Sequence, residues 1–355
     1  MDDASTSVRE NVRMIPLMVK QRSTASRRTS IRRQPAKTPK ATDWKLRRAD
    51  GLQILEAPAL ARLTWLTHGF STRRGGESQM PASGAGKAAG AQKSAGSILN
   101  LGFTDWDIRE RVVANREKFF SAMGAGSTHN KRRGDEMRVV VLKQIHSDVV
   151  HVIRDRKKDA SAVAPTGDAL IAREPGVLLV VQIADCVPVL LADTKNKAVA
   201  AIHSGWRGTL ARIAEKTLGQ MRMEFGTDPT NVVAAIGPAI GRCCYEVGSE
   251  VAQQFEAKFP EAREWFEGPY DKLAAGESDP NWLPWLTMRP PGHAPPPLRV
   301  HLDLIAANRA ILAHAGVPAR QISSAGFCTA CRGDLFFSYR RERITGRLVA
   351  AIGIR

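Results

Sequence analysis

Apolar and polar positions alternate along the chain in patterns that predict strands and helices in a mixed order. Apolar runs and period-two alternation predict strands over residues 63–71, 138–146, 177–183, 187–192, 198–203 and 231–236. Helical spacing of apolar residues predicts helices over residues 108–122, 209–225, 247–259 and 302–315. Residues 336–339 and 348–354 are expected to close the chain as a hairpin around Thr345-Gly346.

The connections between these segments indicate the fold class. A polar turn over residues 193–197 joins two apolar strands, which is typical of an antiparallel hairpin. Elsewhere a helix separates successive strands. Since both kinds of connection occur, we expect an α+β domain with mixed β-sheets rather than a doubly wound parallel sheet.

Three stretches interrupt this pattern. Residues 1–50 are rich in Arg, Ser and Thr and carry too few apolar positions to fold alone, so we expect a disordered basic tail. Residues 80–97 are mainly Ala, Gly, Ser and Lys and are expected to form a flexible surface insertion. Prolines forbid regular structure in a second insertion over residues 268–297. One folded domain is therefore expected over residues 60–355.

The formal net charge of +17 on 355 residues suggests a nucleic-acid partner until it is located along the chain. Residues 1–48 hold 13 Lys or Arg and 4 Asp or Glu, a net charge of +9. The remaining 307 residues therefore carry only +8. The charge argues against nucleic-acid binding by the folded domain, and it leaves a non-catalytic nucleic-acid binder acting through the tail as one hypothesis.

Cysteine number and hydropathy indicate the cellular compartment of the protein. Five cysteines in a chain of this length do not form the disulfide framework of a small secreted domain. No window reaches the roughly 18 consecutive apolar residues that a membrane-spanning helix needs. A protein of a reducing compartment, the cytoplasm, without a membrane partner is expected.

Two residues that bind metals stand on the predicted central hairpin. If Thr194 pairs with Lys197 across the turn, His203 lies opposite Pro188, and Cys186 lies two residues further along the same face. The diagonal Cα separation is then about 7 Å. One metal ion can bridge a thiolate and an imidazole at that separation, because typical Zn–S and Zn–N distances are about 2.3 and 2.1 Å.

His146, at the end of the predicted strand 138–146, is the best candidate for a third ligand. Two histidines and one cysteine leave a fourth position open, which is typical of catalytic rather than structural zinc. A cysteine packed in the core and a histidine bonded to a backbone carbonyl remain the alternative interpretation.

Short motifs on these segments resemble, in order and spacing, a known family. They are Gln144–Ser147, Gly167–Leu170, Ala184–Pro188, His203–Thr209, Gly237–Ile240, Cys244–Val247 and Phe337–Arg341, with His68–Arg73, Leu99–Gly102 and Asn115-Arg116 upstream. The sequence resembles the laccase-domain family over about residues 60–355. That family was named multicopper polyphenol oxidase and is also described as a purine nucleoside phosphorylase and as peptidoglycan editing factor.

The resemblance implies a fold, a metal and a reaction. It implies layered mixed sheets flanked by helices and a zinc site made by His146, Cys186 and His203, the same three residues considered above. The implied activities are phosphorolysis of adenosine, inosine and methylthioadenosine with inorganic phosphate, and deamination of adenosine. The two insertions and the tail depart from the family and leave the metal motifs intact.

Two further residues are candidates for catalysis. Asp185 stands next to a metal ligand and either carries protons or orients His203 or His146 through the second ring nitrogen. Arg207 lies in the loop 204–208 before a predicted helix, where backbone N–H groups and a guanidinium suit phosphate. A solvated surface arginine in a tight turn is the alternative.

Other chemistries remain as alternatives. Copper-dependent phenol oxidation by several copper ions requires around ten histidine ligands by ordinary copper-site logic, and this chain has eight histidines. Cys186 as a nucleophile with His203 as base describes a hydrolase of peptidoglycan precursors. Cys328-Thr-Ala-Cys331 has no second Cys-X-X-Cys partner, so neither a zinc ribbon nor a redox motif is predicted. Cys243 and Cys244 are expected to pack or to line the pocket, and His301 to make a structural hydrogen bond.

Overall fold

The computed structural model describes residues 43–80, 97–125, 137–154, 164–268 and 299–355. The chain divides into residues 1–39 and residues 40–355, and only the second unit contains described residues. Most of the predicted tail, of the insertion 80–97 and of the insertion 268–297 lies outside the described residues, as do His129 and His293. Within the described part of the chain, no helix combines the length and hydropathy needed to cross a bilayer.

Two six-stranded sheets form the centre of the described unit. The first has the order β1 (Lys45–Ala49), β2 (Leu52–Glu56), β3 (Leu66–Ser71), β16 (Leu348–Ile354), β8 (Val177–Ile183) and β5 (Arg138–Val141). The second has the order β15 (Ile322–Ser324), β11 (Val232–Ile236), β9 (Val187–Asp193), β10 (Ala198–Ser204), β7 (Ala169–Ala172) and β6 (Val150–Ile153). Each sheet contains parallel and antiparallel pairs, which confirms the predicted α+β class with mixed sheets.

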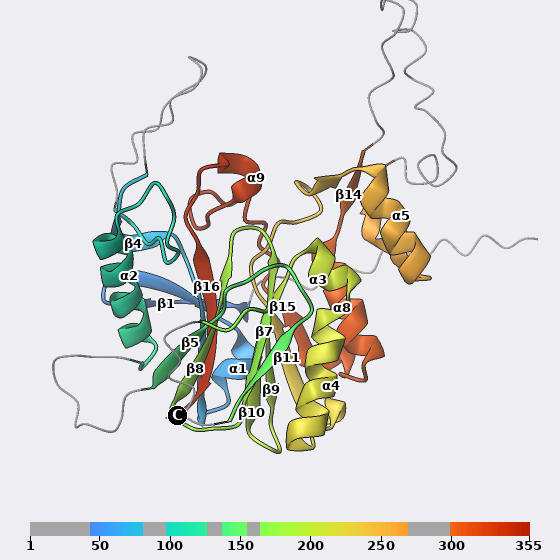
Figure 1. Ribbon diagram of the computed structural model, residues 1–355, viewed down its shortest axis with the longest axis horizontal. Helices are drawn as coiled ribbons and strands as arrows, with labels where there is room; N and C mark the ends of the chain where they lie inside the picture. Colours follow the sequence, from blue (N-terminus) through green and yellow to red (C-terminus); the bar gives the residue numbers. More distant parts are fainter. Residues whose placement is uncertain (1–42, 81–96, 126–136, 155–163, 269–298) are drawn as a thin grey trace, which may run out of the picture. The chain divides into compact units, whose positions relative to one another are not determined.

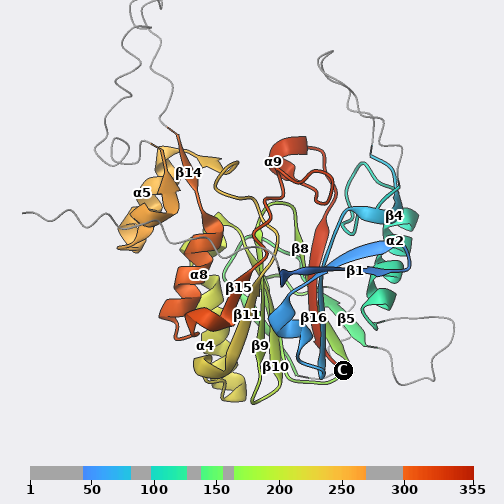
Figure 2. The same ribbon diagram turned by 180° about the vertical axis from the view of Figure 1, so that it is seen from behind.

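Helices cover the outer faces of the two sheets (Figures 1 and 2). Helix α2 (Arg109–Ala122) packs on the first sheet, and α4 (Ile213–Phe225) and α8 (Leu304–His314) pack on the second. Helix α5 (Ser249–Lys258) lies beside a small sheet of β12 (Glu246–Val247), β14 (Val300–Leu302) and β13 (Phe266–Glu267). The short elements are α1 (Pro58–Ala61), β4 (Arg74–Ser78), α3 (Trp206–Leu210) and α9 (Tyr339–Glu342).

Packing on both faces explains why the central strands are apolar along most of their length. In β8, Val177, Leu179 and Val181 belong to the core between the two sheets, whereas Leu178 and Val180 belong to the core under α2. A strand with a packed layer on each face needs apolar side chains at every position. The result is a layered unit in which the rims of the sheets, rather than their faces, remain available for polar groups.

The predicted hairpin forms with the expected register. In the β9–β10 pair His203 lies opposite Pro188, as the turn position predicts. The helix predicted over 209–225 is instead divided into α3 and α4, because Arg212 between them adopts a left-handed conformation with φ 58°. The other helices predicted from 247 and 302 begin slightly later, at Ser249 and Leu304.

The predicted end of the basic tail was wrong. Residues 45–49, assigned to a disordered segment, form β1 and pair antiparallel with β2. The strand stands at the edge of the first sheet, where charged side chains are tolerated because they reach solvent. Arg47 pairs there with Glu56 of β2.

Three strand predictions also need correction. Residues 63–65 precede β3, which begins at Leu66. Strand β5 ends at Val141, before the loop that carries His146. The hairpin of residues 336–339 with 348–354 does not form: Ser338 caps α9, and β16 pairs with β3 and β8. All seven residues of β16 are buried, which requires neighbours on both edges and both faces.

Candidate metal centre

Two loops that cross between the sheets carry two of the predicted ligands. His146 lies between β5 of the first sheet and β6 of the second, and Cys186 lies between β8 of the first and β9 of the second. His203 stands near the end of β10, beside β9. The Gln144 side chain ties the loop that carries His146 to β8, since its amide donates to the Gln182 carbonyl at 2.8 Å and accepts from the Gln182 N–H at 2.7 Å.

The three predicted ligands converge. The ligand atoms of His146, Cys186 and His203 all lie within 4.8 Å of one another. Cys186 Sγ is 3.9 Å from His146 Nε2, and the two imidazole rings lie 4.9 Å apart at 75°. Tetrahedral zinc at ordinary bond lengths needs sulfur–nitrogen and nitrogen–nitrogen separations of about 3.4 to 3.6 Å. The residues therefore fit a metal ion after a small inward movement.

Gly205 permits this close approach. A Cβ at this position would lie 3.0 Å from Cys186 Sγ and 3.1 Å from His146 Cδ2. Gly205 itself has an extended backbone, with φ −73° and ψ 179°, that any residue adopts. Space beside the ligands, and not backbone conformation, therefore requires glycine here.

One buried carboxylate organises two of the ligands. Asp168, fully buried directly before β7, accepts a hydrogen bond of 2.8 Å from His203 Nδ1. This bond assigns the proton to Nδ1 and leaves Nε2 as the ligand nitrogen. Asp168 also accepts from the backbone N–H groups of His146, at 3.1 Å, and Ser147, at 2.6 Å, and from the Ser147 hydroxyl at 2.7 Å. His146 is thereby held in a left-handed conformation, with φ 60°.

The charges of the cluster depend on one another. Burial raises the pKa of the Cys186 thiol, but the neighbouring His203 and His146 imidazoles outweigh it and lower that pKa to about 6. Burial lowers the pKa of His203, but the Cys186 sulfur and the Asp168 carboxylate outweigh it and raise that pKa to about 9. Burial opposes ionisation of Asp168 as well, yet hydrogen bonds from His203 and Ser147 hold its pKa far below the usual range. The Cys186 thiolate, the form that binds metals, is therefore favoured at neutral pH, beside a His203 imidazolium that must lose its Nε2 proton when a metal binds.

Asp185, next to Cys186 in the chain, does not orient a metal ligand through its carboxylate. Its Oδ1 accepts from the Thr329 hydroxyl at 2.6 Å and its Oδ2 accepts from the Arg340 backbone N–H at 2.7 Å. It is 8% exposed and has a φ of 92°, a strained conformation that these two bonds maintain. The predicted alternative, orientation of His203, belongs instead to Asp168.

A pocket of about 770 Å³ opens beside the cluster. Its wall includes all three ligands, Asp185 and a set of basic and aromatic side chains, which are Lys143, Arg340, Arg343, Arg347, Trp206, Tyr245 and Tyr339. Arg207 is not part of this lining: it is exposed, with its guanidinium 4.4 Å from the centre of the Trp206 ring. The pocket therefore offers cationic groups, although not the arginine chosen from the sequence.

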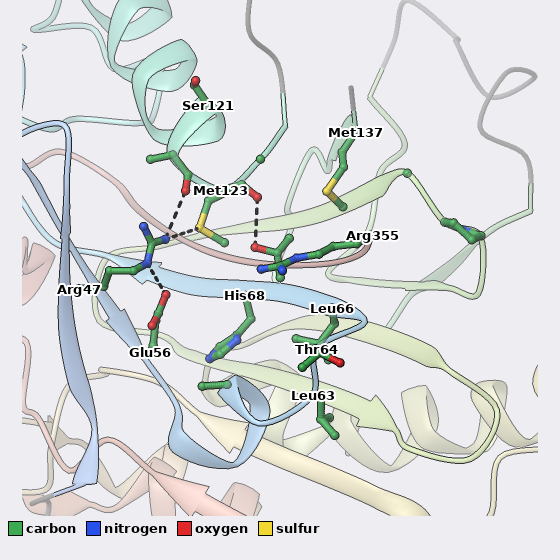
Figure 3. A pocket seen from close by; sticks show the side chains of 16 residues that line it. Arg47, Glu56, Leu63, Thr64, Leu66, His68, Ser121, Met123, Met137 and Arg355 are labelled. Carbon is green, nitrogen blue, oxygen red and sulfur yellow. Dashed lines mark hydrogen bonds and ion pairs between the residues drawn. The ribbon is translucent and has the colours of Figure 1, made fainter. Parts of the chain in front are cut away.

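A second pocket, of about 960 Å³, contains none of the predicted site residues (Figure 3). Arg47 and Glu56 pair on its wall, and His68 lies beside them. His68 is buried, and its Nε2 accepts the Ala57 N–H at 2.9 Å. Burial lowers the pKa of His68 to about 4, so the ring is neutral and structural.

His301 and the four cysteines other than Cys186 contact residues that are far away in the sequence. His301 Nδ1 bonds to the Arg242 carbonyl at 2.8 Å, as the structural interpretation expects. The Cys-X-X-Cys pair, Cys328 and Cys331, is brought together with Cys243 and Cys244. These thiols line no part of the pocket beside the ligands.

Residues 67–355 match the family described as multi-copper polyphenol oxidoreductase laccase. The chain belongs to this laccase family. It is 36% identical over 311 residues to a purine nucleoside phosphorylase of Deinococcus radiodurans, covering 86% of this chain and 94% of that protein. It is 36% identical over 220 residues to an adenosine deaminase of an unknown prokaryotic organism, covering 60% of this chain and 74% of that protein.

Solved structures of the laccase family share the fold. A hypothetical protein of Bacillus licheniformis named YfiH superposes with a TM-score of 0.68 at 27% identity, covering 88% of this chain and all of that one, 100%. The YlmD structure of Geobacillus stearothermophilus superposes with a TM-score of 0.64 at 29% identity, covering 87% and 98%. The predicted resemblance and fold class are confirmed, and the relatives' names indicate a nucleoside-processing enzyme.

Proposed function

We propose that this laccase-family protein is a zinc-dependent purine nucleoside phosphorylase that acts on adenosine, inosine and methylthioadenosine and also deaminates adenosine. The names of the relatives support the class of reaction. The observation that carries the proposal is the position of the three-ligand cluster on the wall of a 770 Å³ pocket with basic and aromatic lining. Pockets of about 300 to 1,000 Å³ accommodate small organic ligands.

His146, Cys186 and His203 would hold the metal. One thiolate and two imidazoles suit zinc, and copper is the alternative ion for the same donors. Zinc supplies Lewis-acid activation of water or of a substrate oxygen at neutral pH. Three protein ligands leave one position for that purpose, whereas a structural site closes with four.

The basic lining is suited to phosphate. Phosphorolysis breaks the bond between ribose C1′ and the purine nitrogen and forms a bond from C1′ to a phosphate oxygen, while the purine nitrogen takes up a proton. Arg340, Arg343 and Arg347 lie on the pocket wall and offer guanidinium groups to the anion. We assign them this role in place of Arg207, because Arg207 is stacked on Trp206 outside the lining.

Asp185 is assigned to proton transfer. Its hydrogen bonds from Thr329 and Arg340 occupy one site on each oxygen, and an ionised carboxylate has about four lone-pair sites. In phosphorolysis it would take a proton from H2PO4⁻ and pass it to the departing purine nitrogen. In deamination a water oxygen replaces the amino group at purine C6, and Asp185 would pass the proton with which ammonia leaves. The aromatic rings of Trp206 and Tyr245 would pack against the purine.

The test is metal analysis combined with product analysis. The full chain is purified, its zinc and copper are measured, and adenosine with phosphate is supplied. Adenine with ribose 1-phosphate reports phosphorolysis, and inosine reports deamination. Cys186→Ala and His146→Ala are expected to lose both activities, while His314→Ala, a histidine with a 60% exposed side chain on α8, retains them.

The other outcomes separate the alternatives. A protein without zinc that yields none of these products, with Cys186→Ala unchanged, contradicts the proposal. Copper with phenol oxidation supports the oxidase. Hydrolysis of peptidoglycan precursors that needs Cys186 but no metal supports the cysteine hydrolase.

The compartment and the role of the basic tail are argued separately from the reaction. We assign the protein to the cytoplasm, because all five cysteines are free thiols. Nucleic-acid binding through the tail is tested by deleting residues 1–42, since a longer deletion would remove β1. Salt-sensitive binding that this deletion abolishes, in a protein without the nucleoside activities, would support the tail hypothesis instead.

A further inference from the structure

Four cysteine thiols meet outside the pocket that contains Asp185. Cys243 and Cys244 lie in the segment between β11 and β12, and Cys328 and Cys331 lie in the segment between β15 and α9. All four sulfur atoms lie within 4.8 Å of one another, with Cys331 Sγ 3.5 Å from Cys243 Sγ and 3.4 Å from Cys244 Sγ. Each is a free thiol.

The strand pairing in the second sheet creates this cluster. Strands β11 and β15 run parallel as neighbours, and the pairing continues beyond them through a bridge between Ala239 and Cys328. The Ala239 N–H donates to the Phe327 carbonyl, and the Thr329 N–H donates to the Ala239 carbonyl at 2.9 Å. Two segments nearly 90 positions apart are therefore held side by side at the point where each presents two cysteines.

The arrangement matches the donor set of structural zinc. Tetrahedral zinc with four thiolates at about 2.3 Å places its sulfur atoms about 3.8 Å apart. The separations of Cys331 Sγ from Cys243 Sγ and Cys244 Sγ, 3.5 and 3.4 Å, are slightly shorter than this value, and all four sulfur atoms lie within 4.8 Å of one another. The Gly241 backbone N–H points at Cys328 Sγ at 3.2 Å, a hydrogen bond that stabilises a thiolate. A disulfide uses two sulfur atoms, whereas all four converge here, and adjacent cysteines such as Cys243 and Cys244 do not pair with each other without strain.

We propose that Cys243, Cys244, Cys328 and Cys331 form a second, closed metal site that binds zinc through four thiolates. Their sulfur ligands fill the four positions of the ion, so the site has no place for substrate and is structural. It is separate from the open cluster of His146, Cys186 and His203, and metal binding at it does not depend on the proposed reaction.

The site would fix the wall that holds Asp185. Thr329, between Cys328 and Cys331, donates to the Asp185 carboxylate. Ile240, close to Cys243 on the other segment, donates its N–H to the Asp185 carbonyl at 2.8 Å. Linking the two segments through one ion would fix both contacts to Asp185 at once.

The test counts zinc ions in the full chain. The wild-type protein purified under reducing conditions is expected to hold two zinc ions per chain, and Cys186→Ala and Cys331→Ser are each expected to hold one. Ala330→Ser, at the neighbouring position between the cysteines, keeps two. A Cys331→Ser protein with the wild-type zinc content, or a disulfide within the cluster of the reduced wild type in place of metal, overturns the proposal.

A spectroscopic measurement tests the proposal even if the Cys331→Ser variant fails to fold. The single zinc remaining in Cys186→Ala is examined by X-ray absorption, and sulfur neighbours alone at about 2.3 Å are expected. Nitrogen or oxygen neighbours, or no remaining zinc, contradict a tetrathiolate site. Failure of the proposed function shows separately, because it removes the nucleoside products and leaves this sulfur-only signal in place.

Discussion

Asp168→Asn is the substitution that tests most directly how the metal cluster is organised. The change keeps the size of the side chain and removes its charge. The carboxylate accepts from His203 on one side and from the His146 and Ser147 backbone on the other. An asparagine amide has one oxygen that accepts and one amino group that only donates. Either His203 Nδ1 or the backbone N–H groups of His146 and Ser147 would therefore face the amino group without an acceptor.

The expected magnitude follows from these bonds. Hydrogen bonds to a charged group contribute about 1.5 to 3 kcal/mol each, and removing one partner of a buried charged pair costs about 3 to 5 kcal/mol of unfolding free energy. Loss of a carboxylate that orients a ligating histidine typically reduces metal affinity about 10- to 100-fold. We therefore expect zinc affinity to fall by about 1.4 to 2.7 kcal/mol, together with a clear loss of stability.

The assay is competition for zinc against a chelator of known affinity, with urea unfolding in parallel. Asp193→Asn is the matched control, because Asp193 is also fully buried and its carboxylate accepts the Lys195 and Asn196 N–H groups. Asp193 ends β9, seven residues from Cys186 and about 20 Å away along the strand. The control should lose stability and keep zinc affinity. If Asp168→Asn retains wild-type zinc affinity, Asp168 does not organise the ligands and the reasoning fails.

Two further predictions concern space and pH. Gly205→Ala places a methyl group 3.0 Å from Cys186 Sγ and should lower zinc affinity at least 10-fold in a folded protein. Gly219→Ala, whose Cβ meets nothing within 4 Å on α4, should instead raise the free energy of unfolding, measured with urea, by about 0.5 to 1 kcal/mol. Equal zinc affinities for both variants would argue against crowding at the ligands. Burial lowers the pKa of His68 from 6.5 to about 4, so the unfolded chain binds this proton first and the unfolding free energy should fall by about 3 kcal/mol as pH drops from 6.5 to 4. Over this pH range, urea unfolding should show a smaller loss of unfolding free energy for His68→Gln than for the wild-type protein. Parallel pH profiles for the two proteins would refute the lowered pKa of His68.

The sequence predicts how Cys186 and His203 approach each other because both lie on one hairpin. Period-two alternation and one turn position are enough to set His203 opposite Pro188. Asp168 was missed as an organising residue because its partners stand 21 to 35 positions away, in segments whose approach the sequence does not specify. An acidic residue directly before a fully apolar strand was the available signal, since a buried charge needs partners.

Pairing between distant segments was the part that sequence patterns did not resolve. The cysteine cluster depends on the parallel contact of β11 with β15, and Cys243 and Cys331 are 88 positions apart. The strand over residues 348–354 was located correctly and given the wrong partner. Its uninterrupted apolar run indicates burial on both faces and argues for a central strand rather than the outer arm of a hairpin.

The central place of β16 has a consequence for how the protein acquires its structure. Ala350 pairs with Phe70, 280 positions earlier, and with Val181 on its other side. During synthesis, one edge of β3 and one edge of β8 stay unpaired until residues 348–354 leave the ribosome. Such non-local pairing slows folding and exposes strand edges to association with other chains. The first sheet therefore closes only after residues 348–354 have been synthesised, and a nascent chain stopped before residue 348 leaves the edges of β3 and β8 open to aggregation.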